Sequence, residues 1–459
     1  MAVGHLAAVA GGPVWRPVAD ADRSWLTRQP LPGAGRPVAE LLHDVRDRIL
    51  PYPMGNGHPR FFGWVNSPPS PAGVLVAPLA AAMNPSCAGG DHAGVLLERT
   101  AVRWLAELVG FPHPPGAGLL TSGASMATVI ALAAARQRAI RQQGHSVRET
   151  GLYGQPPLAV YLSAEGHSCL RKAAELLGMG SHYLRTVPVD GAYRMDTGAL
   201  RRLIASDREA GVRPMLIAAS AGTVNTGAVD PLEEIAGIAR EHELWFHVDG
   251  AYGALGVLDE GIRPVYVGLE RADSLALDPH KWLGVPVDAG CVLFRDPVGP
   301  RDTFSLIPPY LRDDEADDLG WFSEYGPEQT RPFRALRVWA TIAHLGRDGI
   351  AHLVQRTAQL ARALADMIEA SDDFDLIAPA VTSVVAFRHR PKALDPDTTE
   401  ALNQAIPTAV QRRGRAFLTG TRLSGTAALR ACVLHPDTTE ADLTVLLDEI
   451  RTAAREITA

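Results

Sequence analysis

Between about residues 95 and 295, short apolar runs alternate with segments whose apolar residues recur at helical spacing. The runs are "LAVYL" (158–162), "PMLIAAS" (214–220), "LWFHVD" (244–249), "SLAL" (274–277) and "CVLFR" (291–295). Helical patterns such as "SCLRKAAELLG" and "DPLEEIAGIAREH" separate them. Strands that alternate with helices form βαβ units. The pattern predicts an α/β fold with a mainly parallel sheet, whose ligands bind at the carboxyl ends of the strands.

Three parts of the chain differ in composition. Residues 1–85 are rich in proline and glycine, and we expect them to pack on a partner subunit because Phe61, Phe62 and Trp64 need burial. A loose N-terminal arm is the alternative. Residues 86–370 are expected to form the large domain. Residues 371–459 are expected to form a small α+β domain, with strands in "SVVAFRHR" and "LRACVLH" and a last helix opened by an Asp437…Glu440 capping pair.

The bulk composition restricts the classes of function. The 459 residues are 46% hydrophobic and 21% charged, with a net charge of −7, which argues against binding to nucleic acid. No run approaches the ~20 apolar residues that a membrane span needs, and the N-terminus does not resemble a signal peptide. The 4 cysteines lie far apart, so neither a disulfide framework nor a metal site is expected. The expected location is the reducing cytoplasm.

Two features of the central region suit a phosphorylated ring. In "TSGASMAT" the small residues around Ala124 and Ser125 lead directly into a helix, whose N-terminal N–H groups can bind a phosphate. His167 follows the run 158–162, where an imidazole can stack on a flat ring or donate a proton. Each feature also has an ordinary explanation, as a helix N-cap and as a polar loop residue.

Two further features place charges at strand ends. Asp249 closes an apolar run, so its carboxylate needs a cationic or hydrogen-bonding partner. Lys281 follows the run 274–277 in "DPHKW", where an ammonium group among apolar neighbours is suited to forming a Schiff base. A capping aspartate and a salt-bridged lysine are the alternatives for each residue alone. Together with the first two features, they match the requirements of pyridoxal 5'-phosphate: a lysine for its aldehyde and an aspartate for its ring nitrogen.

The chain also resembles a known family. "HVDGAYG", "DPHKWLGVPVDAG" and "EGHSCLRKAAELLG" are similar to the group II pyridoxal-phosphate-dependent amino-acid decarboxylases, the family of aromatic-L-amino-acid decarboxylase. The likeness extends through "HPRFFGWVNSP", "ERTAVRWLAELVGFP", "AGTVNTGAVDP" and "RPFRALRVWATIAHLG". It implies a fold-type-I enzyme with a seven-stranded large domain, a small C-terminal domain and an obligate homodimer.

The resemblance also implies roles for individual residues. Lys281 binds the cofactor aldehyde, Asp249 its ring nitrogen and His167 one ring face. Four further positions are implied around the cofactor or the substrate, and three around the phosphate and the lysine. Those near the ring and the substrate are Ala251 on the opposite face, Thr223 near the 3-hydroxyl, and Trp64 and Ser67 near the substrate. Those near the phosphate and lysine are Ala124, Ser125 and His280. Asp278 stands where some relatives carry asparagine.

Tyr325 resembles a loop tyrosine that returns a proton after carbon dioxide leaves, and relatives with phenylalanine there make aldehydes. It lies in an acidic stretch, 311–331, that we expect to be a long functional loop. The expected reaction is decarboxylation of an aromatic or apolar L-amino acid. The alternatives are oxidative deamination or other carbanion chemistry on the same cofactor, a metal-dependent hydrolase using His247, Asp249 and His280, and an inactive binding protein.

Overall fold

The computed structural model describes residues 1–306 and 319–459, and the chain divides into two compact units. The larger unit comprises Pro69–Arg356 and Ala378–Thr382. The smaller unit comprises Met1–Pro68, Thr357–Ile377 and Ser383–Ala459. The chain therefore divides near residues 68 and 356, whereas the sequence suggested changes near 85 and 370. The packing of residues 1–85 on a partner subunit stays a prediction.

The larger unit is built on a seven-stranded sheet in the order β1-β7-β6-β5-β4-β2-β3. The strands are β1 (Gly118–Thr121), β2 (Leu158–Ser163), β3 (Leu184–Val187), β4 (Arg213–Ser220), β5 (Trp245–Asp249), β6 (Ser274–Leu277) and β7 (Gly290–Phe294). β3, β2, β4, β5 and β6 are parallel, whereas β7 runs antiparallel to both β6 and β1. The predicted α/β class with a mainly parallel sheet is confirmed.

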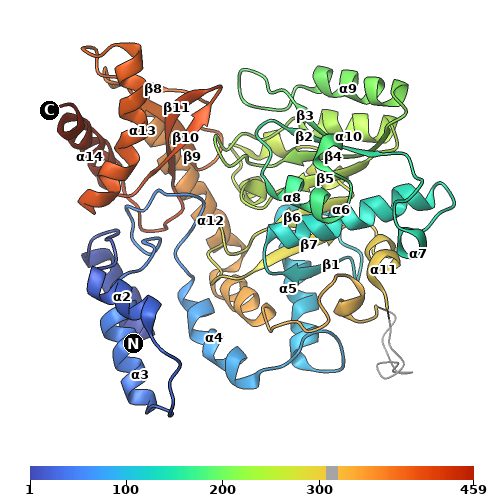
Figure 1. The fold of residues 1–459 in the computed structure, drawn as a ribbon, viewed down its shortest axis with the longest axis horizontal. Coiled ribbons are helices and arrows are strands. Elements are labelled where there is room, and N and C mark those ends of the chain that lie inside the picture. Colours follow the sequence, from blue (N-terminus) through green and yellow to red (C-terminus); the bar gives the residue numbers. More distant parts are fainter. Residues whose placement is uncertain (307–318) are drawn as a thin grey trace. The chain divides into compact units, whose positions relative to one another are not determined.

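Helices cover both faces of this sheet (Figure 1). On one face, Leu216 and Ala218 of β4 pack in one core with the alanine-rich α6 (Ala124–Arg141). On the other face, Tyr161 of β2 donates a hydrogen bond to Asp207 of α9 (Thr197–Glu209). Because both faces are covered, every residue of β2, β5, β6 and β7 is buried, which explains their continuous apolar runs.

The remaining helices of the larger unit complete these layers. They are α4 (Pro71–Met83), α5 (Ala93–Val109), α7 (Val147–Thr150), α8 (Cys169–Leu176), α10 (Leu232–Glu241) and α11 (Val298–Phe304); α12 (Ala335–Glu369) runs on into the smaller unit. A buried ion pair joins Arg331 to Glu98 of α5, with 2.5 Å between Nη2 and Oε1. Both side chains also hydrogen-bond the backbone of Leu120, so the pair fixes β1 against α5.

The smaller unit carries a four-stranded antiparallel sheet in the order β10-β11-β9-β8. Its strands are β8 (Phe374–Leu376), β9 (Val384–His389), β10 (Thr419–Leu423) and β11 (Thr426–Cys432), and its helices are α1 (Ala2–Ala8), α2 (Asp20–Arg28), α3 (Val38–Asp44), α13 (Pro396–Arg413) and α14 (Glu440–Thr458). The expected Asp437…Glu440 cap is wrong. Thr439 is the N-cap and exchanges hydrogen bonds with Asp442, because α14 begins two residues later than the sequence suggested.

Part of the N-terminal segment belongs to this smaller unit. Phe61 stacks on Phe417 with 4.8 Å between ring centroids. The N–H of Phe62 donates to the Phe417 carbonyl, and the N–H of Cys432 donates to the Phe62 carbonyl. Phe61 and Phe62 are buried as expected, whereas Trp64 is 47% exposed.

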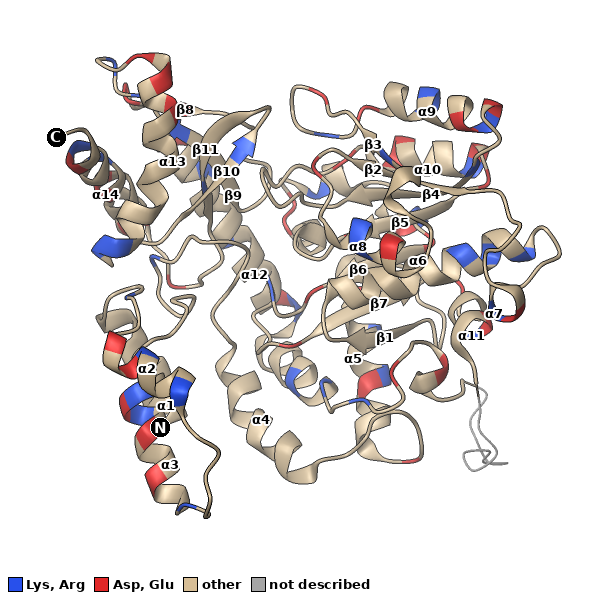
Figure 2. Cartoon of the chain, viewed as in Figure 1, with Lys and Arg blue, Asp and Glu red and all other residues tan. Residues whose placement is uncertain are grey.

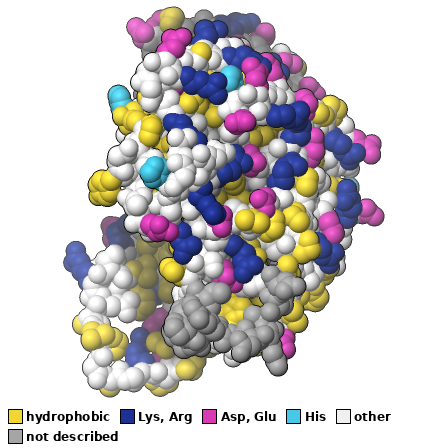
Figure 3. Space-filling model, turned by 90° about the vertical axis from the view of Figure 1, so that its right-hand side faces the viewer, with side chains coloured by type: hydrophobic (Ala, Val, Ile, Leu, Met, Phe, Trp, Pro, Cys, Tyr) yellow, Lys and Arg dark blue, Asp and Glu magenta, His cyan; other side chains and the backbone are white. Residues whose placement is uncertain are grey.

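Charged residues of both signs are interspersed along the outer helices, for example on α2 and α9 (Figure 2). Figure 3 shows the same mixture on one face of the molecule, with apolar side chains scattered between the charges. Over the described residues, no helix combines the length and the apolar character that a membrane crossing requires.

Candidate active site

Asp249 and Lys281 lie at the same edge of the large sheet. Asp249 is the last residue of β5 and pairs with Ala276 of β6, and the chain turns from β6 into the stretch that carries Lys281. The N–H of Asp278 donates to the carbonyl of Ala251, 3.1 Å away, so the two strand exits are tied together. Adjacent parallel strands thus bring an acid and an amine to the same edge of the sheet.

The turn after β6 holds Lys281 against a carboxylate. Nζ of Lys281 lies 3.0 Å from Oδ2 of Asp278, and the lysine side chain is 20% exposed. The next residue, Trp282, is buried and stacks on Tyr252 with 5.0 Å between ring centroids. The indole anchors the turn in the core, and the neighbouring ammonium group stays partly exposed at the sheet edge.

The start of α6 meets the same aspartate. The N–H of Ala124 donates to Oδ1 of Asp278 at 2.6 Å, and Ser125 is exposed beside it. Nδ1 of His280 lies 3.8 Å from Oδ1 of Asp278 and donates to the carbonyl of Ala289 at 2.7 Å. The residues expected around the phosphate and the lysine are therefore together. Asp278, which the sequence marked as a departure, has a defined contact at their centre.

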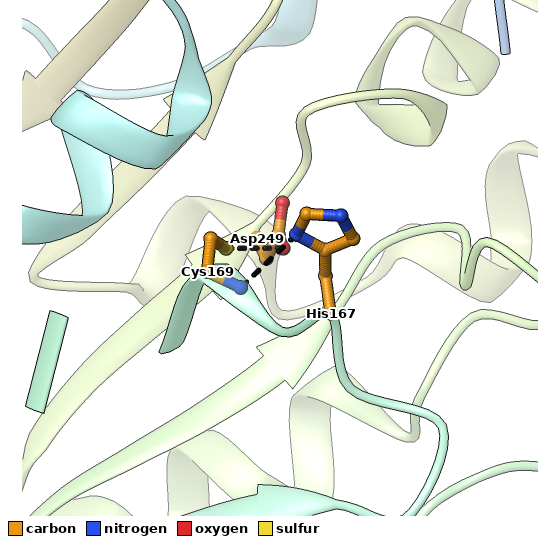
Figure 4. Close-up of side chains that lie close together, drawn as sticks. All are labelled: His167, Cys169 and Asp249. Atoms are coloured by element: carbon orange, nitrogen blue, oxygen red, sulfur yellow. Dashed lines mark hydrogen bonds between the residues drawn. The ribbon is translucent and has the colours of Figure 1, made fainter. Parts of the chain in front are cut away.

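A second cluster surrounds Asp249, which is 8% exposed. Its Oδ1 accepts the N–H of Ala251 at 3.1 Å, and its Oδ2 lies 3.9 Å from Sγ of Cys169. Nδ1 of the exposed His167 accepts the N–H of Cys169 at 3.2 Å. Figure 4 shows these three side chains close together: Asp249 at the end of β5, His167 in the loop after β2, and Cys169 at the start of α8.

The same cluster brings three potential metal ligands within 4.8 Å of one another. Two of them have another role in this arrangement. Nδ1 of His167 already accepts a backbone N–H. Burial and the neighbouring Asp249 raise the pKa of the Cys169 thiol to about 12, so the sulfur keeps its proton. The donor set therefore suits hydrogen bonding to a protonated ring nitrogen better than cation binding.

Thr223 and Ala251, expected on the cofactor ring, lie in turns at this sheet edge. Oγ1 of Thr223 is 2.9 Å from Oγ1 of Thr226 and accepts the N–H of Ala228. The turn before Thr223 packs closely against the turn after Ala251, because a Cβ on Gly222 would lie 2.9 Å from Cα of Gly253. The contact of Thr223 with the 3-hydroxyl stays a prediction.

Tyr325 is buried in the core of the larger unit. Its hydroxyl donates to the carbonyl of Leu319 at 2.6 Å, and the side chain is 2% exposed. Residues 307–318 of the neighbouring sequence lie outside the described part of the chain. The role of Tyr325 as the proton donor stays a prediction.

Trp64 and Ser67, expected near the substrate, belong to the smaller unit. The indole of Trp64 lies against Phe417, and the carbonyl of Ser67 accepts a hydrogen bond from the Asn56 amide. Their relation to the substrate stays a prediction.

Two polar residues of this region were not singled out as parts of a cofactor site. Cys169 begins α8, where the sequence pattern indicated a helix and nothing more. His247 is fully buried in β5, two residues before Asp249, and Nδ1 lies 2.8 Å from Oγ of Ser274. The signal for Cys169 was its position two residues after His167, which puts its N–H within reach of the imidazole.

The residues present fit pyridoxal phosphate. An amine for the aldehyde, a carboxylate for the ring nitrogen, an imidazole for a ring face and a helix N-terminus for the phosphate meet at one sheet edge. Together with the order and directions of the strands, this arrangement defines the class of fold-type-I pyridoxal-phosphate enzymes.

Comparison with known proteins identifies the family. The pyridoxal-dependent decarboxylase conserved domain matches residues 24–390, so the chain belongs to this family and is a pyridoxal-phosphate-dependent amino-acid decarboxylase. It is 32% identical to an aromatic-L-amino-acid decarboxylase of Bacillus atrophaeus, over 93% of this chain and 88% of the relative. It is 28% identical to a phenylacetaldehyde synthase of Arabidopsis thaliana, over 87% of this chain and 83% of that protein. Oryza sativa TDC, solved with PLP and tryptamine, superposes with a TM-score of 0.91 at 25% identity, covering 100% of this chain and 96% of that one. The family, fold-type and cofactor predictions are confirmed.

Proposed function

We propose that this decarboxylase acts on an aromatic or apolar L-amino acid and releases the corresponding amine and carbon dioxide. One observation supports the site most directly. The N–H of Asp278, in the turn that carries Lys281, donates to the carbonyl of Ala251, which lies two residues after Asp249. This hydrogen bond holds the acid and the amine at the same edge of the sheet. The preference for an aromatic substrate rests on the printed names of relatives, including aromatic-L-amino-acid and tryptophan decarboxylases.

Pyridoxal phosphate, when bound, supplies an aldehyde that condenses with amines and a ring that accepts an electron pair. Nζ of Lys281 would hold the aldehyde of the bound cofactor. The carboxylate of Asp249 keeps the proton on the ring nitrogen. The exposed N-terminus of α6 at Ser125 binds the phosphate, where the helix dipole favours an anion.

The imidazole of His167 covers one face of the ring. Because its Nδ1 accepts a hydrogen bond, the neutral ring carries its proton on Nε2 and can donate it. In this proposal His167 or Tyr325 returns a proton to the α-carbon after carbon dioxide has left. Tyr325 would first exchange its hydrogen bond to Leu319 for one to the substrate.

The first test is Lys281→Ala. We expect loss of turnover by several orders of magnitude and loss of the chromophore that borohydride reduces, because the amine that holds the aldehyde is gone. Lys172→Ala, at an exposed position of α8, is the matched control and should leave both unchanged. Full activity of Lys281→Ala would contradict the proposal.

The substrate is tested by incubating the holoenzyme with each of the twenty amino acids and measuring carbon dioxide and amine. Tryptophan, tyrosine, phenylalanine or a large aliphatic residue should be the best substrate. A clear preference for glutamate or aspartate would contradict the proposed substrate class.

Aldehyde formation is the second candidate, and the 28% identity to a phenylacetaldehyde synthase favours keeping it. Decarboxylation followed by oxidative deamination consumes oxygen and releases hydrogen peroxide and ammonia. Oxygen uptake equal to carbon dioxide release would assign this activity, whereas amine formation without oxygen uptake assigns plain decarboxylation.

We also infer that the enzyme is a cytoplasmic homodimer. Cys87, Cys169 and Cys291 are buried cysteines that form no disulfide within the described part of the chain, which supports a reducing compartment. Exposed apolar side chains on α4 support a subunit interface. Fractionation of cells that express the full chain tests the location, and recovery outside the cytoplasmic fraction would contradict it.

A further inference from the structure

We propose that Cys169 is a positioning residue for the cofactor, whose thiol donates a hydrogen bond to Oδ2 of Asp249 and holds that carboxylate in the orientation that receives the ring N–H. The proposal rests on the cofactor role of Asp249 proposed above. It assigns a function to a cysteine that the mechanism does not otherwise use.

The geometry around the sulfur supports donation to Asp249. Sγ lies 3.9 Å from Oδ2 of Asp249 and 3.7 Å from Oγ1 of Thr128. The thiol has one proton to give, and the carboxylate can accept but not donate. Once the thiol proton points to Asp249, the Thr128 hydroxyl can donate to the sulfur. Thr128, Cys169 and Asp249 then form a directional chain of hydrogen bonds that ends on the carboxylate, and Figure 4 shows its last step, from Cys169 to Asp249.

The second oxygen of the carboxylate is held from the other side. Oδ1 accepts the N–H of Ala251, so the two oxygens have one donor each. Two donors on different oxygens fix the plane of a carboxylate, whereas one donor leaves it free to rotate. Asp249 is 8% exposed, so few water molecules can replace a lost donor.

Residue 169 also orients His167 through its backbone. Its N–H donates to Nδ1 of His167 at 3.2 Å, while its side chain contacts Asp249. One residue therefore ties the group expected on the ring face to the group expected at the ring nitrogen. The side chain is 3% exposed and the sulfur keeps its proton, so the donor persists across the working pH range.

The test compares Cys169→Ala, which removes the donor, with Cys169→Ser, which keeps one. Affinity is measured by adding pyridoxal phosphate to each apoenzyme and following the quenching of intrinsic fluorescence. We expect the Kd of Cys169→Ala to rise about threefold to tenfold, the range for the loss of one ordinary hydrogen bond, because a thiol is a weak donor. Cys169→Ser should stay within about twofold of the parent.

Cys87→Ala is the matched control, because Cys87 is also fully buried and belongs to the same unit. It should leave the Kd unchanged. In an Asp249→Asn background, Cys169→Ala should change the Kd by less than about twofold, because the charged acceptor is already gone. Equal losses in the Ala and Ser variants, or an equal effect in both backgrounds, would show a packing role and overturn the inference.

An infrared measurement on the apoenzyme gives a readout that needs no cofactor. The S–H stretching band of Cys169 is identified by its absence from the spectrum of Cys169→Ser. In Asp249→Asn this band should move to higher frequency, because the thiol then donates to a weaker acceptor. No movement would overturn the inference. If the unaltered apoenzyme binds no pyridoxal phosphate, the proposed function fails, whereas tight binding by both the parent and Cys169→Ala removes this inference alone.

Discussion

At the scale of single residues, His247 shows how the sheet supports the site. It lies on the same face of β5 as Trp245 and Asp249, and it is fully buried. Oγ of Ser274 accepts a hydrogen bond from Nε1 of Trp245, so its own proton can go to Nδ1 of His247. Burial lowers the pKa of His247 to about 4, and the imidazole is neutral directly below the carboxylate.

This burial predicts that the larger unit loses stability in acid. The unfolded chain protonates His247 near pH 6.5, whereas the folded chain does so near pH 4. The unfolded state therefore binds more protons in this window, and stability falls by up to about 3 kcal/mol as the pH drops through it. Urea unfolding between pH 7 and pH 4 measures the effect.

His247→Gln should show a shallower loss of stability over that window. His145→Gln, at an exposed loop position, is the control and should keep the parent slope. The same pH dependence in the parent and in His247→Gln would contradict the assignment.

The sequence identified the charged residues of the site better than their partners. Asp249 and Lys281 were visible because one ends an apolar run and the other follows one closely, and ligands bind at the carboxyl ends of parallel strands. Cys169 could not be found this way, because a cysteine in an amphipathic pattern looks like any small apolar residue. Its contact with Asp249 joins two distant parts of the sequence and depends on how β2 and β5 lie in the sheet.

At the scale of elements, the start of β7 sets the position of the α6 N-terminus. A Cβ on Gly290 would lie 2.4 Å from Cα of Gly123 and 2.6 Å from Oγ1 of Thr121. The backbones of the strand and of the residue before α6 are thus in direct contact. Any side chain at position 290 must push them apart.

Gly290→Ala should therefore weaken both stability and cofactor binding. Overpacking of this kind costs about 1–3 kcal/mol, and displacement of α6 should raise the Kd for pyridoxal phosphate at least several-fold. Chemical denaturation and cofactor titration measure the two effects. Gly299→Ala in α11, whose Cβ would meet Trp245 at an ordinary 3.6 Å, is the control. Unchanged cofactor affinity in Gly290→Ala would contradict this role of the glycine.

Strand prediction succeeded where a strand is buried on both faces and appears in the sequence as a continuous apolar run. β2, β4, β5, β6 and β7 all match apolar runs in the sequence, to within one residue at each end. β1 was missed because only two of its four residues, Leu119 and Leu120, are apolar, and β3 because three of its four residues are partly or fully exposed at the sheet edge. Such strands owe their conformation to a neighbouring strand rather than to a local pattern.

At the scale of the whole molecule, α4 presents an exposed apolar surface. Its apolar residues include Leu75, Leu79 and Met83, which are 61%, 59% and 58% exposed. Their spacing of four puts them on one stripe of the helix. A contiguous apolar stripe of this kind is typical of a subunit interface.

The proposed homodimer predicts that charges on this stripe separate the subunits. The double variant Leu75→Glu, Leu79→Glu should elute as a monomer at micromolar concentration, whereas the parent elutes as a dimer. Light scattering during size-exclusion chromatography gives the masses. Leu176→Glu, at an exposed leucine of α8, is the control and should remain dimeric. A monomeric parent, or a dimeric double variant, would contradict the proposed interface.

The division of the chain into units also orders its folding during synthesis. The larger unit comes almost entirely from one continuous stretch, so the ribosome releases nearly all of it before residue 383 is made. Phe61 leaves the ribosome early, but its stacking partner Phe417 is made near the end of translation. The side chain of Phe61 therefore lacks its stacking partner until the last strands of the smaller unit have been synthesised.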